Sequence, residues 1–145
     1  LLLNADIAIA QNNTQFTQIE VLRGILPFGG ATSRFVQSAG WSNAMRYLLT
    51  GDLFDAQTAL NLNLITELTA DRPLNRAIEL AQRIAKAAPL AVQATLAAAK
   101  DAIELSESES FENLNKHLKP LLASNDAQEG VKAMLERREP LFTGK

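Results

Sequence analysis

Charged side chains are distributed unevenly along this chain. Residues 51–145 hold twenty-five of the thirty charged side chains, and residues 1–50 hold only five: Asp6, Glu20, Arg23, Arg34 and Arg46. A segment so poor in charge is normally interior or ligand-facing, because charged residues cover the free surface of a domain. We therefore expect residues 1–50 to pack against further protein, and the apolar first residues indicate the C-terminal part of a larger domain. The alternative is a short protein that begins with an apolar strand.

Composition excludes several classes of protein. The net charge is −2 and 47% of the residues are hydrophobic, which is typical of a globular domain without a basic surface for nucleic acid or anionic lipid. The absence of cysteine excludes disulfides, thiolate metal sites and a cysteine nucleophile, and it fits a reducing cytoplasm. No apolar run is long enough to span a bilayer, and no signal-peptide pattern is present. We expect a soluble, cytoplasmic protein with no metal, nucleic-acid or membrane partner.

The hydropathy pattern predicts an α/β region followed by helices. Short strands are expected over 6–10, 15–19 and 64–68, and helices over 33–39, 43–50, 56–62, 73–88, 90–105, 107–119 and from about 125 to about 138. Several of these boundaries follow from capping chemistry. The residues concerned are Thr32 or Ser33, Ser42, Asp55, the pair Ser106 and Glu109, Ser124 or Asp126, the left-handed position Asn63, and Pro120, which we expect to interrupt its helix.

One carboxylate precedes a glycine-rich loop. Glu20 ends an otherwise uncharged predicted strand, and residues 24–30 contain the pair Gly29-Gly30. A carboxylate at such a place suits general acid/base catalysis, and the N–H groups of Phe28, Gly29 and Gly30 can hold a water or an anionic oxygen. The alternative is that Glu20 lies on the surface and the glycines only turn the chain. The single histidine, His117, lies in a polar helix and favours a surface or subunit contact over catalysis.

The order of motifs along the whole chain resembles the C-terminal half of the crotonase (enoyl-CoA hydratase/isomerase) superfamily. The motifs that carry this resemblance are Phe16-x-Gln18-x-Glu20, Gly24-Ile25-x-Pro27-x-Gly29-Gly30, Leu48-Leu49-Thr50-Gly51-Asp52, Asp55-Ala56-x-x-Ala59-Leu60, Asp126-Ala127-x-Glu129-Gly130 and Glu136-Arg137-Arg138-x-Pro140-x-Phe142-Thr143-Gly144. The resemblance implies a ClpP/crotonase spiral of ββα units. Residues 1–70 would be the C-terminal part of this core without its N-terminal half. Residues 71–145 would form the helical region that builds trimers, often paired into hexamers.

The resemblance also implies a chemistry. Family members act on acyl-CoA thioesters, commonly in fatty-acid metabolism, and stabilise a thioester enolate with two backbone N–H groups. No cofactor is implied beyond the coenzyme A of the substrate. Glu20 matches the second of two glutamates that move protons in the hydratases, whereas the first glutamate and both oxyanion donors would lie upstream of residue 1. We therefore expect this chain by itself to be inactive.

Six further residues match positions around the family's substrate. Ile19, Pro27, Phe28 and Gly29 would bind the substrate, with Phe28 and Gly29 shaping the acyl pocket. Met134 and Arg137 would reach the adenine and phosphate end of CoA bound in a neighbouring subunit. An arginine suits a phosphate in charge and geometry, but a solvated helix end explains Arg137 equally well. Phe28 stands where hydratases commonly carry glycine, so hydration and double-bond isomerisation both remain open. A non-catalytic CoA-binding or assembly module of the same fold is the alternative.

Overall fold

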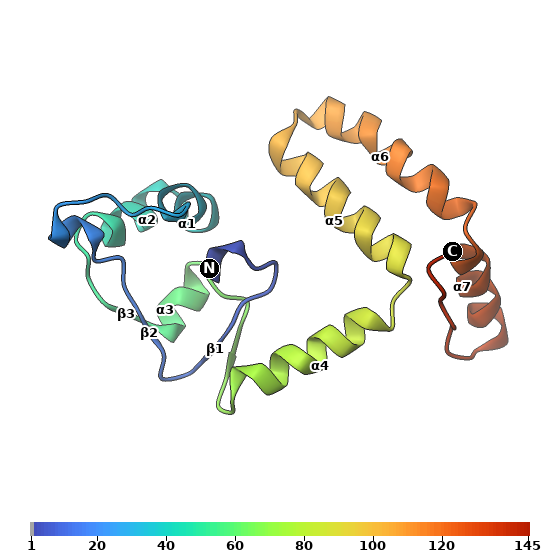
Figure 1. Cartoon of the computed structure of the whole chain (residues 1–145), viewed down its shortest axis with the longest axis horizontal. Helices are drawn as coiled ribbons and strands as arrows, with labels where there is room; N and C mark the ends of the chain where they lie inside the picture. The colour runs from blue at the N-terminus through green and yellow to red at the C-terminus, as the bar shows by residue number, and fades with distance from the viewer. Residues whose placement is uncertain (1) are drawn as a thin grey trace. The chain divides into compact units, whose positions relative to one another are not determined.

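The computed structural model describes residues 2–145, which form two compact units (Figure 1). The first unit ends at Ile78, and the second comprises Glu79–Lys145. The division falls inside helix α4 (Pro73–Ala85), whereas the sequence placed a boundary before this helix. The role of residues 71–145 in trimer formation stays a prediction. Among residues 2–145, no helix is both long and apolar enough to cross a membrane.

The first unit combines two small sheets with three complete helices and the first residues of α4. Strand β1 (Ile9–Gln11) pairs in parallel with β4 (Glu67–Thr69), and β2 (Gln15–Phe16) pairs antiparallel with β3 (Phe54–Asp55). The helices are α1 (Ala31–Ala39), α2 (Trp41–Leu48) and α3 (Ala56–Asn61), and two short 3₁₀ turns are η1 (Leu2–Asn4) and η2 (Glu20–Arg23). The strands are therefore short, and helices predominate in the described residues.

Three strands were predicted and four are present, because the two-residue strand β3 was not predicted, and the boundaries of the other three were wrong. The strand expected over 6–10 begins at Ile9, the one over 15–19 ends at Phe16, and the one over 64–68 begins at Glu67. Leu64 and Ile65 are both buried although they are adjacent, so they fill the core from a turn rather than alternate across a sheet. A short apolar run cannot by itself distinguish a strand from a buried turn.

An aromatic cluster joins the β2–β3 pair to α1 and α2. The ring of Phe54 lies 4.4 Å from that of Tyr47 and 5.6 Å from that of Phe16, measured between centroids. Phe35 of α1 is only 1% exposed and packs against Phe54 at 6.0 Å. Burial of a side chain of this size contributes about 2–3 kcal/mol to stability, so this cluster is a main support of the first unit.

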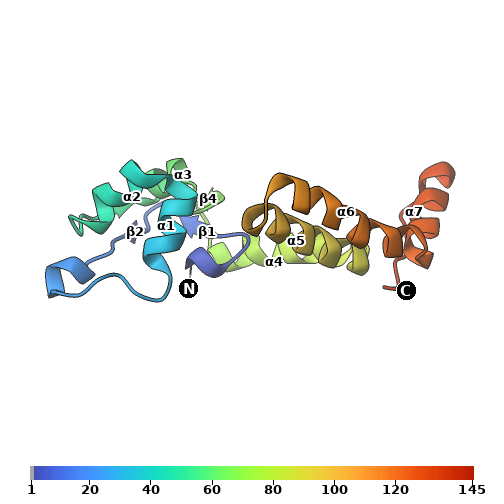
Figure 2. The same cartoon turned by 90° about the horizontal axis from the view of Figure 1, so that it is seen from above.

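The second unit is helical. Helices α5 (Pro89–Glu104) and α6 (Glu107–Leu122) form a hairpin and lie side by side in both views (Figures 1 and 2), and α7 (Asn125–Glu136) follows. The predicted capping box of Ser106 and Glu109 is confirmed, and of the two candidates for the last helix it is Ser124 that caps α7.

One helix boundary of the second unit was predicted wrongly. Pro120 lies inside α6, which continues to Leu122, so it does not interrupt the helix as expected. A proline removes only its own backbone hydrogen bond and strains the preceding turn. Near the exposed end of a helix, the two residues that follow it, Leu121 and Leu122, still remain helical.

Candidate functional site

Glu20 begins the 3₁₀ turn η2 and does not end a strand, because β2 stops at Phe16. The turn is closed by the Leu22 N–H, which donates to the Ile19 carbonyl at 3.0 Å, and by the Ile25 N–H, which donates to the Glu20 carbonyl at 3.2 Å. A 3₁₀ turn sets side chains at a different spacing from a strand. The local fold thus holds the half-buried Glu20 side chain on a short hydrogen-bonded turn.

The loop after η2 turns sharply at two glycines. Gly29 and Gly30 have φ values of +69° and +86°, a left-handed conformation that suits glycine. The Gly30 carbonyl accepts the Arg34 N–H at 2.9 Å, which starts α1. Within residues 2–145, none of the backbone N–H groups of residues 28–30 donates to another residue. They are therefore available to hold an oxygen atom of a ligand.

A polar cleft of about 230 Å³ opens at this turn. It is lined by Leu3, Asn4, Gln18, Glu20, Phe28, Gly29, Gly30, Ala31 and Arg34. Three residues predicted from the sequence as catalytic or substrate-binding, Glu20, Phe28 and Gly29, thus share one cleft. Phe28 is 72% exposed, so its ring is free to meet a ligand.

Three polar side chains of the cleft, Asn4, Gln18 and Arg34, were not assigned a catalytic or substrate-binding role from the sequence. When its amide is oriented to satisfy its neighbours, Gln18 donates from its nitrogen to Glu20 Oε2 at 3.1 Å and to Oε1 at 3.3 Å. Arg34 Nη1 donates to the Leu3 carbonyl at 3.3 Å and fastens α1 to η1. In the sequence, Gln18 could have been found from its spacing of two residues from Glu20. Arg34 could have been found from its position one helical turn after Gly30.

The other predicted substrate-binding residues do not line this cleft. Ile19 is 41% exposed and Pro27 is buried, although both lie next to lining residues in the sequence. Met134 and Arg137 belong to the second unit, at the C-terminal end of α7. Met134 is 70% exposed, and the Arg137 side chain is also exposed.

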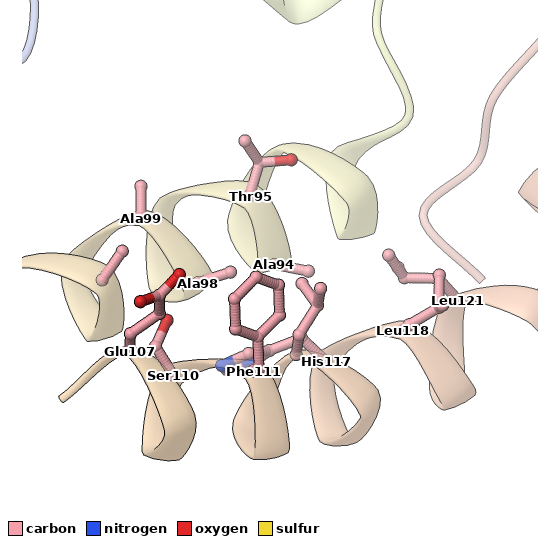
Figure 3. A pocket seen from close by; sticks show the side chains of 12 residues that line it. Ala94, Thr95, Ala98, Ala99, Glu107, Ser110, Phe111, His117, Leu118 and Leu121 are labelled. Atoms are coloured by element: carbon pink, nitrogen blue, oxygen red, sulfur yellow. The ribbon is translucent and has the colours of Figure 1, made fainter. Parts of the chain in front are cut away.

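A larger and mainly apolar groove lies between α5 and α6 (Figure 3). Its volume is about 670 Å³, and its lining includes Ala94, Ala98, Ala102, Phe111, Leu114, His117, Leu118 and Leu121. His117 is half-buried there and its Nε2 lies 2.9 Å from Asp101 Oδ2. This hydrogen bond lowers the pKa of the Asp101 carboxyl below its usual value. The pair links α5 to α6, so a structural role accounts for His117.

Within residues 2–145, no three His, Cys, Asp or Glu side chains are grouped so that they could hold a metal ion. The chemistry that the cleft offers is accordingly that of one carboxylate, two side-chain amides, one guanidinium and a turn whose backbone N–H groups donate to no other described residue. Such a set can move a proton and bind an oxygen atom of a reacting molecule.

Comparison with known proteins identifies the family that shares this architecture. The family model for enoyl-CoA hydratase/isomerase matches residues 1–145. The 2,3-dehydroadipyl-CoA hydratase of Escherichia coli K12 is 32% identical over 146 residues, which cover 100% of this chain and 57% of that protein. The mitochondrial enoyl-CoA hydratase of Pongo abelii is 32% identical over 98% of this chain and 49% of its own length.

Solved structures agree with these relatives. The crystal structure of a protein described as a probable enoyl-CoA hydratase/isomerase from Mycobacterium abscessus superimposes with a TM-score of 0.95 at 45% identity, over 99% of this chain and 56% of that one. The chain thus has a crotonase-like α/β fold, and it spans about half the length of the relatives it matches. On the match to the family model and these likenesses, this chain belongs to the enoyl-CoA hydratase/isomerase family of the crotonase superfamily.

Proposed function

We propose that the protein containing this chain acts on acyl-CoA thioesters, hydrating or isomerising the double bond of an enoyl-CoA with Glu20 as general acid/base. The observation that carries the proposal is the Glu20 carboxylate, held by Gln18 in the polar cleft beside the Gly29-Gly30 turn. Membership of the enoyl-CoA hydratase/isomerase family supplies the substrate class. Coenzyme A enters as part of the substrate, and no further cofactor is required.

The chemistry follows from charge development in the thioester. In hydration, the oxygen of water bonds to the β-carbon while a carboxylate accepts the proton of the water. The electron pair of the C=C bond moves onto the thioester oxygen, and the resulting enolate then takes up a proton at the α-carbon. In isomerisation, a carboxylate removes a proton from one carbon of the substrate and a proton is returned to another. Glu20 serves either sequence, because both need one proton carrier beside the acyl chain.

The proposed catalysis requires more than residues 1–145. By the family resemblance, the two oxyanion donors and a first glutamate would lie upstream of this segment, so we propose that the segment alone is inactive. We further propose that the helical second unit assembles trimers or hexamers in the cytoplasm. Met134 and Arg137, both exposed at the end of α7, would then contact the adenine and phosphate end of CoA.

A non-catalytic CoA-binding or assembly module is the second candidate. It is favoured by Phe28, a bulky and exposed side chain in the cleft where the hydratases commonly carry glycine. A ring at this place competes with a reacting water for space. The same observation favours isomerisation over hydration if the protein is an enzyme.

The Glu20→Gln variant of the complete protein separates these functions. Loss of the proton carrier should lower the turnover of an enoyl-CoA by about 100-fold or more, while the amide keeps the shape of the side chain. The matched control is Glu112→Gln, which removes an exposed carboxylate from α6. If the wild type is active and Glu20→Gln turns over at the wild-type rate, Glu20 has no catalytic role. If the wild type binds acyl-CoA without turnover, the binding module is the correct function.

A further inference from the structure

The last turn of α7 ends at an arginine in a left-handed conformation. Arg137 has φ +53° and ψ +43°, a region in which the Cβ atom of any residue other than glycine comes close to the following carbonyl. The Arg137 N–H donates to the Met134 carbonyl at 3.3 Å, and the Arg138 N–H donates to the Ala133 carbonyl at 3.0 Å. The chain leaves the helix axis at this point, so the two adjacent arginines enter different surroundings.

Arg138 is held on all three of its guanidinium nitrogens. Its Nη1 and Nη2 donate to the two carboxylate oxygens of Glu129 at 2.6 and 2.9 Å, and its Nε donates to Glu136 at 2.6 Å. Paired hydrogen bonds between an arginine and a carboxylate fix both position and orientation. We call the two residues joined in this way, Glu129 and Arg138, the clamp.

The clamp also fastens the segment that follows the turn. Glu129 Oε1 accepts the Leu141 N–H at 2.8 Å. Hydrogen bonding to Arg138, and then to the Leu141 N–H, lowers the pKa of Glu129 to about 2. Glu129 is therefore ionised at neutral pH, and the residues on the C-terminal side of Arg137 are tied back to the side of α7.

Arg137 itself is left free. Its exposed guanidinium donates to no other residue among 2–145, in contrast to its neighbour Arg138. Met134 lies three residues earlier on the same turn and is 70% exposed. A guanidinium matches the oxygens of a phosphate, and a flexible thioether packs against a flat ring. The two side chains together offer contacts for a nucleotide.

We propose that Glu129 and Arg138 are positioning residues for the nucleotide end of acyl-CoA. The clamp holds residue 137 in the left-handed turn and neutralises Arg138, so that the Arg137 guanidinium is the one presented to a phosphate. This inference rests on the proposed function, because the phosphate is available only if an acyl-CoA is the substrate. Neither clamp residue touches the reacting atoms.

Two thioester substrates test the clamp in the complete protein. One is an enoyl-CoA, and the other is the N-acetylcysteamine thioester of the same acyl group, which has the reacting thioester but neither phosphate nor adenine. Glu129→Gln should lower kcat/KM for the enoyl-CoA by about 5- to 10-fold, mainly through KM, because a charge-assisted contact is misplaced. The same variant should turn over the N-acetylcysteamine thioester at the wild-type rate. The control Glu112→Gln should leave the turnover of both thioesters unchanged.

A double variant shows whether the clamp acts through Arg137. Arg137→Gln should produce the same substrate-dependent loss, and Glu129→Gln combined with Arg137→Gln should lose no more than Arg137→Gln alone, because both changes affect one contact. Arg138→Lys keeps the charge but not the paired geometry, and it should behave as Glu129→Gln does. A thermal melt of each variant identifies any variant that does not fold. If Glu129→Gln does not fold, the same kinetic comparison is made with Arg138→Lys.

Several results would overturn the positioning role. The first is a double variant whose loss of kcat/KM is the product of the two single losses. The second is an equal loss of kcat/KM on both thioesters. The third is wild-type kinetics of both clamp variants although Arg137→Gln is impaired. If Arg137→Gln is itself unimpaired, the nucleotide contact is wrong and the clamp with it, but the catalytic proposal for Glu20 stands. If the wild type turns over neither thioester, the proposed function fails and the positioning role fails with it.

Discussion

The buried carboxylate of Asp126 accepts the Gly144 N–H at 2.8 Å and so ties the end of the chain to the start of α7. Its other oxygen accepts the Thr143 N–H at 2.7 Å. In return, the Lys145 carbonyl accepts the Asn125 N–H at 2.8 Å, which satisfies a donor that the first turn of a helix leaves unpaired. Asp126 is only 3% exposed, so water cannot replace these contacts.

Replacement of Asp126 by asparagine should destabilise the protein by about 1–3 kcal/mol. The amide nitrogen cannot accept a hydrogen bond, so one N–H of the tail loses its partner and the buried side chain of residue 126 faces it with a second donor. Unfolding in urea measures the loss, and the matched control is Asp71→Asn, an exposed site expected to change stability by less than about 0.5 kcal/mol. Equal midpoints for the two variants would show that the tail is not held by Asp126.

Truncation of Phe35 to alanine should cost about 3–5 kcal/mol, because the removed ring leaves a cavity in the aromatic cluster. The ring is 1% exposed and lies 6.0 Å from that of Phe54 and 6.3 Å from that of Tyr47. Phe35→Leu keeps much of the apolar volume and should cost roughly 1.5 kcal/mol or less. Both values come from chemical unfolding, and a cost below about 1 kcal/mol for Phe35→Ala would remove the cluster from the core.

The contribution of Glu129 to stability should depend on pH. Its pKa is lowered from 4.5 to about 2 in the folded chain, so the folded state binds this proton less readily than the unfolded state does. The stabilisation is fully present above pH 4.5 and is lost as the pH falls from 4.5 through about 2. Glu129→Gln should therefore unfold earlier than the wild type at neutral pH, and the difference should disappear toward pH 2. A difference in urea midpoint that stays constant over this range would contradict the assignment.

The candidate site was partly visible in the sequence. Glu20 and the Gly29-Gly30 turn lie within ten residues of each other, and their residue types alone suggested a carboxylate beside free backbone N–H groups. Sequence reasoning placed Glu20 at a strand end, whereas it lies in a 3₁₀ turn. It also left Gln18 and Arg34 without a catalytic or substrate-binding role. Gln18 lies only two residues from Glu20, whereas the presence of Arg34 in the same cleft depends on the path of the chain between β2 and α1.

Local interactions explain what the sequence determined by itself. The capping box of Ser106 and Glu109, the cap at Asp55 and the left-handed conformation of Asn63 were all predicted and are all present. Each depends on atoms within three or four residues. The caps expected at Thr32 or Ser33 and at Ser42 were wrong, because α1 and α2 begin after Gly30 and Gly40 without a side-chain cap. The family was recognised from the sequence for a related reason, because local motifs of this kind occur in the order typical of the family, and the family model matches the whole chain.

Only the tertiary structure decided which distant residues meet. The pairing of β1 with β4, the hydrogen bonds of Asp126 to the tail and the choice of Arg138 over Arg137 as the partner of Glu129 all join separate parts of the chain. Two adjacent arginines have identical local preferences, and no spacing rule distinguishes them. The left-handed turn at residue 137 separates them, because it directs one guanidinium against the side of α7 and leaves the other in solvent.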